Sequence, residues 1–475
     1  MAESRKTSTA STTSTTSKVS KTVSKTSKTV EKQKTSTAKA PTPSAPALRP
    51  TPRVSVFTPS HQPRYLDDCL ATLQAQTYPD WEWVVLLNRG ARWRPERPDE
   101  RVRVEIADDI TGVGAAKRRA CALTRGDILV ELDHDDLLAK DCLARVVEAF
   151  DSDSDAVFVY SDCTQIGADG SADLSRFNPV HGWVYDDVDV DGRTVLGLHS
   201  LPATPHNLAY IWYAPNHVRA FRWEAYDKVG GYDAERDILD DQDLMCRLYQ
   251  VGAFHHIKQC LYLQRMHPAN TQREPEINAR IQTETIALYD RHLQANALAW
   301  AHREGLAALD LGAAHSKPAG FLGVDQYPGP SVDLVATLPG RLDLPDNSVG
   351  VIRAVDFLEH VPQKVELINE IYRLLAPGGM LLSFTPSSDG RGAYQDPTHV
   401  AFYNENSFWY YTDENYRRYV PEIKARFQTS RLLTCFPSPW HEEHRIPYVA
   451  ANLIAIKEGA PRCGGPLMVE PAEAC

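Results

Sequence analysis

The 475-residue chain lacks several features that define whole classes of protein. It has no uninterrupted apolar run near the ~18 residues needed to cross a bilayer, and its first residues lack the apolar stretch of a secretion signal. Its nine cysteines include no Cys-x-x-Cys pair, which argues against a zinc site or a disulfide framework. We therefore expect a soluble, cytoplasmic protein without a membrane span, whose cysteines are mostly reduced core thiols.

The first fifty residues lack aromatic side chains and contain no Leu before Leu48. They hold 22 Ser or Thr, and their ten Lys or Arg against two acids give a net charge of +8. Because the whole chain has a net charge of −11, the remaining residues carry −19. Such a segment has no apolar surface to offset its chain entropy. We predict a disordered, basic tail over residues 1–51.

The acidity of the rest of the chain argues against a broad basic groove for nucleic acid. The tail alone could supply about eight positive charges to a polyanion. The alternative is a solubilising, low-complexity extension. The composition favours the solubilising extension and leaves binding to a polyanion open.

Beyond the tail, segments with the pattern of buried strands alternate with amphipathic helices, which predicts an α/β fold with a parallel sheet flanked by helices. The chain is long enough for two or three domains, which excludes a small binding module alone. The expected strands of the first half are 54–57, 81–87, 102–106 and 127–132, with helices at 65–76 and 114–123.

A second α/β unit follows a stretch rich in helix formers, for which we predict a connecting helix over 274–302. Strands are expected at 307–312, 321–325, 349–354 and 380–385, with a helix over 366–375 that Pro377-Gly378-Gly379 stops. We therefore divide the chain into the tail, a domain over 52–273, the helix, a domain over 303–460 and a tail over 461–475.

Carboxylates cluster in the segment Glu131-Leu132-Asp133-His134-Asp135-Asp136, directly after a predicted strand. Clustered carboxylates repel one another unless a cation compensates, and a hard divalent ion such as Mg²⁺ or Mn²⁺ suits oxygen ligands. A plainer alternative is that these acids cap a helix beginning at Leu137.

Several further motifs follow one another in the order found in family 2 glycosyltransferases of the GT-A fold, which residues 52–272 resemble. The resemblance implies binding of a nucleoside-diphosphate sugar by Pro59, Ser60, Asn88, Lys117 and Asp133. Asn88 departs from the acid that the family usually carries there. The motifs are 54–88, Gly112-Val113-Gly114-Ala115-Ala116-Lys117-Arg118, Asp133-His134-Asp135, Gly230-Gly231-Tyr232-Asp233 and Asp240-Asp241-Gln242-Asp243.

The same resemblance assigns chemical roles. Asp135 would hold the metal ion, and His267 in Arg265-Met266-His267-Pro268 would be a second ligand or a phosphate contact. Asp241 would be the general base that accepts the proton of the acceptor hydroxyl, so that displacement is direct and the anomeric configuration inverts. Asp243 is expected to anchor or cap a helix.

Residues 303–420 resemble class I methyltransferases, which have a Rossmann-like fold and use S-adenosylmethionine. The resemblance implies cofactor binding by Asp310, Gly312 and Asp325. Ala313-Ala314 stand where the family commonly has a further glycine, so the sequence leaves cofactor binding open. The motifs are Leu309-Asp310-Leu311-Gly312, Gly323-Val324-Asp325, Glu359-His360-Val361, Leu374-Leu375-Ala376-Pro377-Gly378-Gly379 and Asp396-Pro397-Thr398-His399.

The sequence thus predicts a metal-dependent, inverting glycosyltransferase with an added methyltransferase-like domain. That domain either supplies methyl transfer as a second activity or serves as a scaffold. The acceptor is a glycan hydroxyl, a Ser or Thr of a virion or surface protein, or a hydroxymethylated base in viral DNA. Residues 212–213 and 216–217 lie where acceptor loops are expected, but they equally suit a core. A different class, a non-catalytic scaffold in both halves, is disfavoured by the retained Asp133, Asp135 and Asp241.

Overall fold

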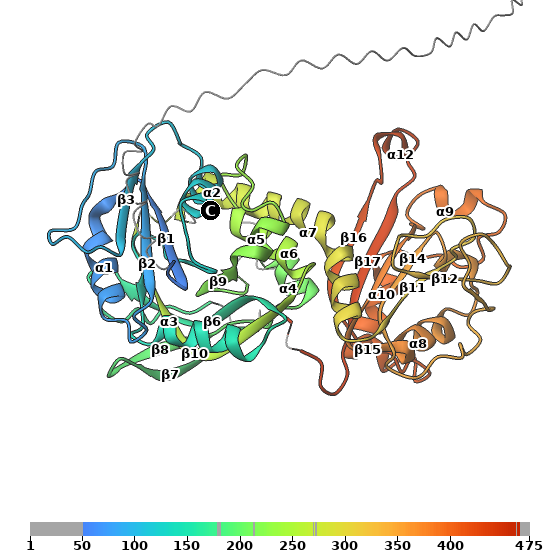
Figure 1. Cartoon of the computed structure of the whole chain (residues 1–475). Coiled ribbons are helices and arrows are strands. Elements are labelled where there is room, and N and C mark those ends of the chain that lie inside the picture. The colour runs from blue at the N-terminus through green and yellow to red at the C-terminus, as the bar shows by residue number, and fades with distance from the viewer. Residues whose placement is uncertain are drawn as a thin grey trace, which may run out of the picture. The chain divides into compact units, whose positions relative to one another are not determined.

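The computed structural model describes residues 51–177, 182–211, 214–268, 270, 273–461 and 463–465 (Figure 1). The predicted disorder of the basic tail falls outside these residues, apart from residue 51, and so do Trp212, Tyr213 and most of the predicted carboxyl-terminal tail. Within the described part of the chain, every helix is too short or too polar to cross a membrane.

The first half is built on a mixed sheet with the strand order β3-β2-β1-β4-β9-β6-β10-β5, to which the β7–β8 hairpin is added beside β6. Strands β3, β2, β1 and β4 are parallel, whereas β9 runs antiparallel to both β4 and β6. The strands are β1 (Val54–Ser60), β2 (Trp81–Leu87), β3 (Val102–Ile106), β4 (Ile128–Glu131), β5 (Leu137–Leu138), β6 (Ala156–Gly167), β7 (Val184–Val190), β8 (Arg193–His199), β9 (Arg219–Arg222) and β10 (Ala253–Met266).

Helices cover both faces of this sheet, which explains why β1 reads as a continuous apolar run. Val54 and Val56 pack into the cluster that contains residues of α1 and α3, and Phe57 packs into the cluster that contains residues of α2, α5 and α6. The helical elements are η1 (Pro63–Tyr65), α1 (Leu66–Gln74), α2 (Val113–Ala122), α3 (Cys142–Ser152), α4 (Pro205–Tyr210), α5 (Trp223–Lys228) and α6 (Asp240–Tyr249).

The second sheet has the order β13-β12-β11-β14-β15-β17-β16. Its first five strands are parallel, and β17 is antiparallel to both β15 and β16. The order reverses between β11 and β14, and open sheets bind ligands at the carboxyl ends of strands at such a point. The strands are β11 (Ala307–Leu311), β12 (Leu322–Asp325), β13 (Leu334–Val335), β14 (Val349–Val355), β15 (Leu375–Pro386), β16 (Phe427–Cys435) and β17 (Tyr448–Ala455).

The long helix α7 (Pro275–Arg303) joins the two halves where the sequence predicts a connecting helix. Its buried residues Leu293, Ala297 and Ala301 pack in one cluster with Ala308 and Val351 of the second sheet. Residues from Thr51 onward form one compact unit, so the boundaries at 273 and 303 remain predictions. The other helices are η4 (Leu358–His360), α8 (Lys364–Leu374), α9 (Gly392–Gln395), α10 (Glu405–Thr412), α11 (Glu414–Arg417) and α12 (Pro439–Glu443).

The expected α/β fold with two sheets is therefore confirmed, whereas one alternative interpretation and one local prediction were wrong. Leu137 does not begin a helix that the acidic segment caps, because Leu137–Leu138 is strand β5 and the next helix begins at Cys142. Pro377-Gly378-Gly379 does not stop α8 either. The helix ends at Leu374, and β15 already includes the Pro-Gly-Gly segment.

Candidate active site

A cavity of about 650 Å³ opens in the first half of the chain. It brings together all eight residues that the sequence suggests for the sugar-nucleotide site, although they are spread over more than 200 positions. These residues are Pro59, Ser60, Asn88, Lys117, Asp133, Asp135, Asp241 and His267.

The parallel strands explain why distant residues meet here. Phe57 of β1 is in register with Val84 of β2 and Glu131 of β4, so the three strands end at the same edge of the sheet. The residues at or just beyond these ends are Ser60, Asn88 and Asp133. Ligands bind beyond the carboxyl ends of the strands in open sheets of this kind.

Asp135 and His267 lie in direct contact, with 2.8 Å between the carboxylate Oδ2 and the imidazole Nε2. Tyr65 stacks on the His267 ring, and the backbone N–H of His267 donates to the side chain of Asn270 at 2.6 Å. The side chains of Asp135 and His267 are 14% and 12% exposed. A carboxylate and an imidazole are therefore held side by side at the cavity wall.

A second set of ligating atoms overlaps this region. Asp133, Asp136 and His217 each offer one such atom within 4.8 Å of the others. Both Asp136 oxygens already accept hydrogen bonds, from the N–H of Arg265 and the hydroxyl of Tyr262. Asp136 and His217 are also each 2% exposed. Asp136 therefore fits a structural role.

The residues present suit a divalent ion. Mg²⁺ and Mn²⁺ prefer carboxylate oxygens and tolerate an imidazole. Asp135 and His267 are the more accessible of the ligating groups, and Asp133 lies in the same segment. We therefore retain Asp135 and His267 as the residues that would hold the ion.

Burial raises the pKa of Asp133 to about 7, with the charges of Glu131 and Asp135 acting in the same direction. A cation nearby would favour the charged carboxylate. The electrostatics of the segment thus agree with the compensating ion that its sequence suggests.

Lys117 does not project a free ammonium into the cavity. Its Nζ lies 2.7 Å from Glu131 Oε1 and 2.8 Å from Asp240 Oδ2. Burial acts to lower the pKa of Lys117, but the two carboxylates raise it well above its usual value. We infer that Lys117 holds the acidic wall in place, and direct donor contact by Lys117 remains a prediction.

The sequence did not assign a role to Glu131 or Arg219, which complete this wall. Glu131 is fully buried and accepts the hydroxyl of Tyr232 at 2.7 Å. Burial acts to raise its pKa, but the charges of Lys117 and Arg219 lower it to about 2. An Arg within the otherwise apolar stretch Val218-Arg219-Ala220-Phe221 is the sequence signal that could have pointed to Arg219, because a charge in a buried strand requires a partner.

Asp241 stands in the first turn of α6. Its Oδ2 lies 2.7 Å from the Arg219 guanidinium, and its Oδ1 accepts the N–H of Gln242 at 2.7 Å. The start of a helix favours acidic side chains. The side chain is 19% exposed and lines the cavity. Arg219 and the N–H of Gln242 therefore orient the carboxylate without covering it.

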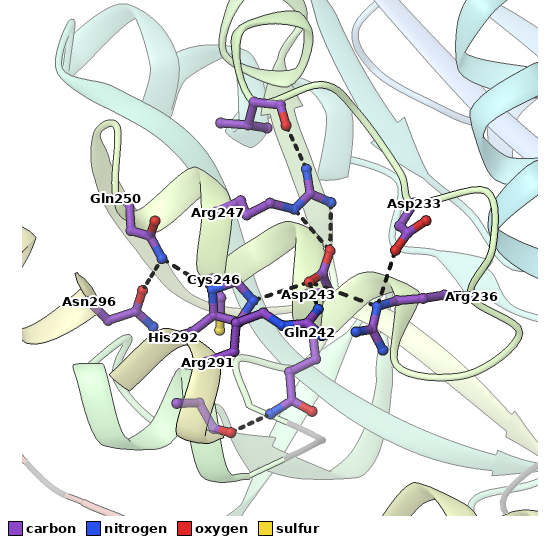
Figure 2. Close-up of polar contacts among 12 residues, drawn as sticks. Asp233, Arg236, Gln242, Asp243, Cys246, Arg247, Gln250, Arg291, His292 and Asn296 are labelled. Atoms are coloured by element: carbon purple, nitrogen blue, oxygen red, sulfur yellow. Dashed lines mark hydrogen bonds and ion pairs between the residues drawn. The ribbon is translucent and has the colours of Figure 1, made fainter. Parts of the chain in front are cut away.

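Asp243 is not among the residues that line the cavity and belongs to a separate network, as expected of a residue that anchors a helix (Figure 2). Its carboxylate contacts Arg247 at 2.7 Å and His292 of α7 at 3.1 Å. Burial acts to raise the pKa of Asp243, but these partners lower it to about 2. Asp243 therefore ties α6 to α7.

Asn88 and Ser60 fit a polar rim of the cavity. The Asn88 amide donates to the carbonyl of Ile110 at 3.0 Å, and its backbone N–H donates to Ser60 at 3.1 Å. The Ser60 hydroxyl is buried without a hydrogen-bond partner in the described part of the chain. A nucleotide would offer that hydroxyl a partner.

The predicted cofactor residues of the second half lie at the ends of neighbouring strands. Asp310 is buried and pairs with Arg353 at 2.7 Å, which points to a structural role. Gly312 has φ +78° just after β11, where a side chain is strained. The two carboxylate oxygens of Asp325 accept the N–H groups of Ala314 and Tyr327.

The alanine at position 313 is accommodated. Its methyl group is buried, and a β-carbon added at Gly323 would come within 2.7 Å of it. Ala313 therefore packs against the neighbouring strand and does not fill the crevice. The residues after β11 and β12 fit an adenosyl cofactor, for which Gly312 and Asp325 would be contacts.

Two family models match separate parts of the chain. Residues 55–176 match the family model described as Glycosyl transferase family 2, and residues 296–383 match the one described as Methyltransferase domain. The chain is 28% identical over 222 residues to the O-antigen biosynthesis protein RfbC of Myxococcus xanthus, covering 44% of this chain and 16% of that protein.

Two further similarities are to one curated protein and to one solved structure. A "Probable S-adenosylmethionine-dependent methyltransferase" of Mycolicibacterium smegmatis is 35% identical over 75 residues, which cover 15% of this chain and 29% of that protein. A solved mannosyltransferase from Pyrobaculum calidifontis, in complex with GDP-Man and Mn²⁺, aligns with a TM-score of 0.38 and 18% identity, covering 55% of this chain and 73% of that one.

The chain joins a family 2 glycosyl transferase domain to a methyltransferase domain. It spans 16% and 29% of the two relatives named.

Proposed function

We propose that the first half transfers a sugar from a nucleoside-diphosphate sugar to an acceptor hydroxyl, with a bound Mn²⁺ or Mg²⁺ and with inversion at the anomeric carbon. The observation that carries this proposal is the convergence of Asp133, Asp135 and Asp241 on one cavity, together with His267. Three acids from two separate segments at one cavity suit a reaction that needs both a metal and a base.

Donor binding is assigned to the edge formed by β1, β2 and β4. Ser60 and Asn88 would contact the nucleoside and Asp133 its ribose, while Asp135 and His267 would hold the ion. When bound, the ion offsets the negative charge that develops on the diphosphate leaving group.

Asp241 is assigned the role of base. A base must lie within hydrogen-bond reach of the acceptor hydroxyl, on the face opposite the leaving group. Asp241 would accept that proton on its carboxylate while Arg219 holds the side chain in one orientation. Lys117 would keep Asp240 out of the reaction by pairing with it.

Hydrolysis of sugar nucleotides by the purified protein, with Mn²⁺ and with a chelator, tests this function. The expected result is Mn²⁺-dependent hydrolysis of at least one common donor that Asp135→Asn abolishes. Asp227→Asn is the matched control, because Asp227 is an exposed carboxylate on α5. Equal hydrolysis by the wild type and Asp135→Asn, or none with any donor, would count against the proposal.

A second activity is proposed for the other half, which we infer binds S-adenosylmethionine. The support is the reversal of strand order at Gly312, together with the accommodated Ala313. Calorimetry with S-adenosylmethionine tests it. The expected result is one binding site that Asp325→Ala weakens, whereas absence of binding would favour a scaffold.

The acceptor is proposed to be a glycan, protein or modified-nucleobase hydroxyl. If nucleic acid binds through the basic tail, DNA binding should fall steeply with salt and disappear when residues 1–50 are deleted. Equal binding by the shortened protein would exclude that role of the tail.

A further inference from the structure

A second group of ligating side chains lies in the methyltransferase half, far along the chain from the sugar-nucleotide cavity. Glu359, His360 and His399 each offer one ligating atom within 4.8 Å of the others. Glu359 and His360 belong to η4, just after β14, and His399 follows α9. The three residues therefore come from two loops beyond the carboxyl ends of the strands.

Both imidazoles are oriented through their Nδ1 atoms. His399 Nδ1 lies 3.0 Å from the carbonyl oxygen of Ala393, and His360 Nδ1 lies 3.2 Å from that of Thr398. The Thr398 hydroxyl also lies 3.2 Å from His360 Nδ1, but it donates its own proton to Asp396 at 2.6 Å. Because a carbonyl can only accept, each neutral imidazole carries its proton on Nδ1 and keeps the lone pair on Nε2. Histidines that bind metals are commonly held in this way.

Glu359 supplies an unpartnered carboxylate oxygen. The residue is 2% exposed, and its Oε2 accepts the hydroxyl of Thr385 in β15. Its Oε1 is buried and has no hydrogen-bond partner in the described part of the chain. That atom lies 4.0 Å from His399 Nε2, beyond hydrogen-bond distance. A buried carboxylate oxygen without a partner is costly.

The two loops are joined independently of any ligand. The backbone N–H groups of Val400 and Ala401 both donate to the carbonyl of Glu359 at 2.9 Å. The rings of His360 and His399 meet edge to face, with 5.0 Å between their centroids. The three side chains are therefore positioned before an ion arrives.

We propose that Glu359, His360 and His399 bind a divalent transition-metal ion, with Zn²⁺ or Fe²⁺ as the best match. Two imidazole nitrogens and one carboxylate favour these ions over Mg²⁺ and Ca²⁺, which prefer oxygen ligands. Three protein ligands leave a four-coordinate ion one open position for water or a ligand oxygen. The open position would lie at the edge of the sheet where substrates of such folds bind.

Zinc binding is measured on the full chain after treatment with a chelator, by calorimetry and by metal analysis of the dialysed protein. Asp135→Asn is the parent for all variants, so that zinc binding at the first cavity is weakened. We expect this parent to bind one equivalent of Zn²⁺ that a large excess of Mg²⁺ does not displace. His360→Ala and His399→Ala should each weaken that binding at least tenfold.

Two more variants separate a metal site from a structural cluster. Thr385→Val removes the hydroxyl that orients Glu359, and loss of such an outer partner typically weakens metal binding about 10- to 100-fold. His315→Ala removes an exposed histidine and should leave zinc binding unchanged. Because His360 is exposed, His360→Ala keeps the test valid even if the His399 variant fails to fold.

Zn²⁺ should also raise the Tm of the Asp135→Asn parent and not that of its His360→Ala derivative, because an ion that binds only the folded state stabilises it. The proposal is overturned if the parent binds no Zn²⁺ or if both histidine variants bind it as tightly as the parent. The metal site is independent of sugar transfer, so hydrolysis of sugar nucleotides by His360→Ala in the wild-type background should be unchanged.

Discussion

Arg219 and Asp241 form an ion pair with 2.7 Å between Nη2 and Oδ2 at the wall of the cavity. Arg219 is buried in strand β9, and Asp241 lies in the first turn of helix α6. The pairing orients one oxygen of the proposed base and is backed by Glu131, 3.6 Å from the same guanidinium. The position of Asp241 therefore depends on a row of opposite charges, in which Glu131 contacts Arg219 and Arg219 contacts Asp241.

Replacing Asp241 by Asn should lower sugar transfer at saturating donor by about 10²- to 10⁴-fold, the usual contribution of a general base. Donor binding should stay near normal because the cation ligands are untouched. Steady-state kinetics and calorimetry with the donor measure the two effects. Asp227→Asn serves as the control, and wild-type turnover by Asp241→Asn would remove Asp241 as the base.

Replacing Asp243 by Asn should lower the free energy of unfolding by about 1–3 kcal/mol, because it removes the carboxylate charge that buried His292 and partly buried Arg247 contact. Denaturant titration measures the change. Below the unfolding transition, Mn²⁺-dependent donor binding should be retained because Asp243 does not line the cavity. A variant as stable as the wild type would contradict the anchoring role.

Acidification should destabilise the protein through His206. His206 is buried between Ser430 and Gly464, and burial lowers its pKa to about 4. Between the unfolded value near 6.5 and the folded value near 4, the unfolded chain takes up a proton that the folded chain does not. Stability contributed by neutral His206 is thus complete above about pH 6.5 and falls by about 3 kcal/mol down to about pH 4.

His206→Gln removes this titration and retains hydrogen-bonding capacity. We expect the loss of stability between pH 7 and pH 4.5 to be smaller in the variant than in the wild type, as measured by urea unfolding at each pH. Because both proteins have the same carboxylates, the contribution of these groups to the pH dependence cancels in the comparison. Equal losses in the two proteins would mean that His206 is protonated in the folded state.

Much of the fold follows from local pattern. The apolar run at Val54 and the alternation of strands with helices predict parallel strands, and parallel strands place Ser60, Asn88 and Asp133 at one edge. The order of motifs then locates Asp135 and His267, which the structure brings to 2.8 Å.

Pairings across the fold were beyond reach of the sequence. Lys117 is 14 residues from Glu131 and 123 from Asp240 along the chain. Its position in a predicted amphipathic helix does not predict a buried ion pair with either carboxylate. Leu137 was misplaced in the alternative interpretation because pairing with β10 turns a two-residue apolar segment into a strand. Tertiary contacts decide such short segments.

The central claim is that the acids and His267 form one metal-dependent site for a nucleoside diphosphate, and it is tested most directly by calorimetry with a panel of nucleoside diphosphates. The account predicts that at least one binds in the presence of Mn²⁺, that a chelator weakens the binding at least tenfold, and that Asp135→Asn does the same. Tight binding that neither the chelator nor the substitution changes, or no binding at all, would contradict it.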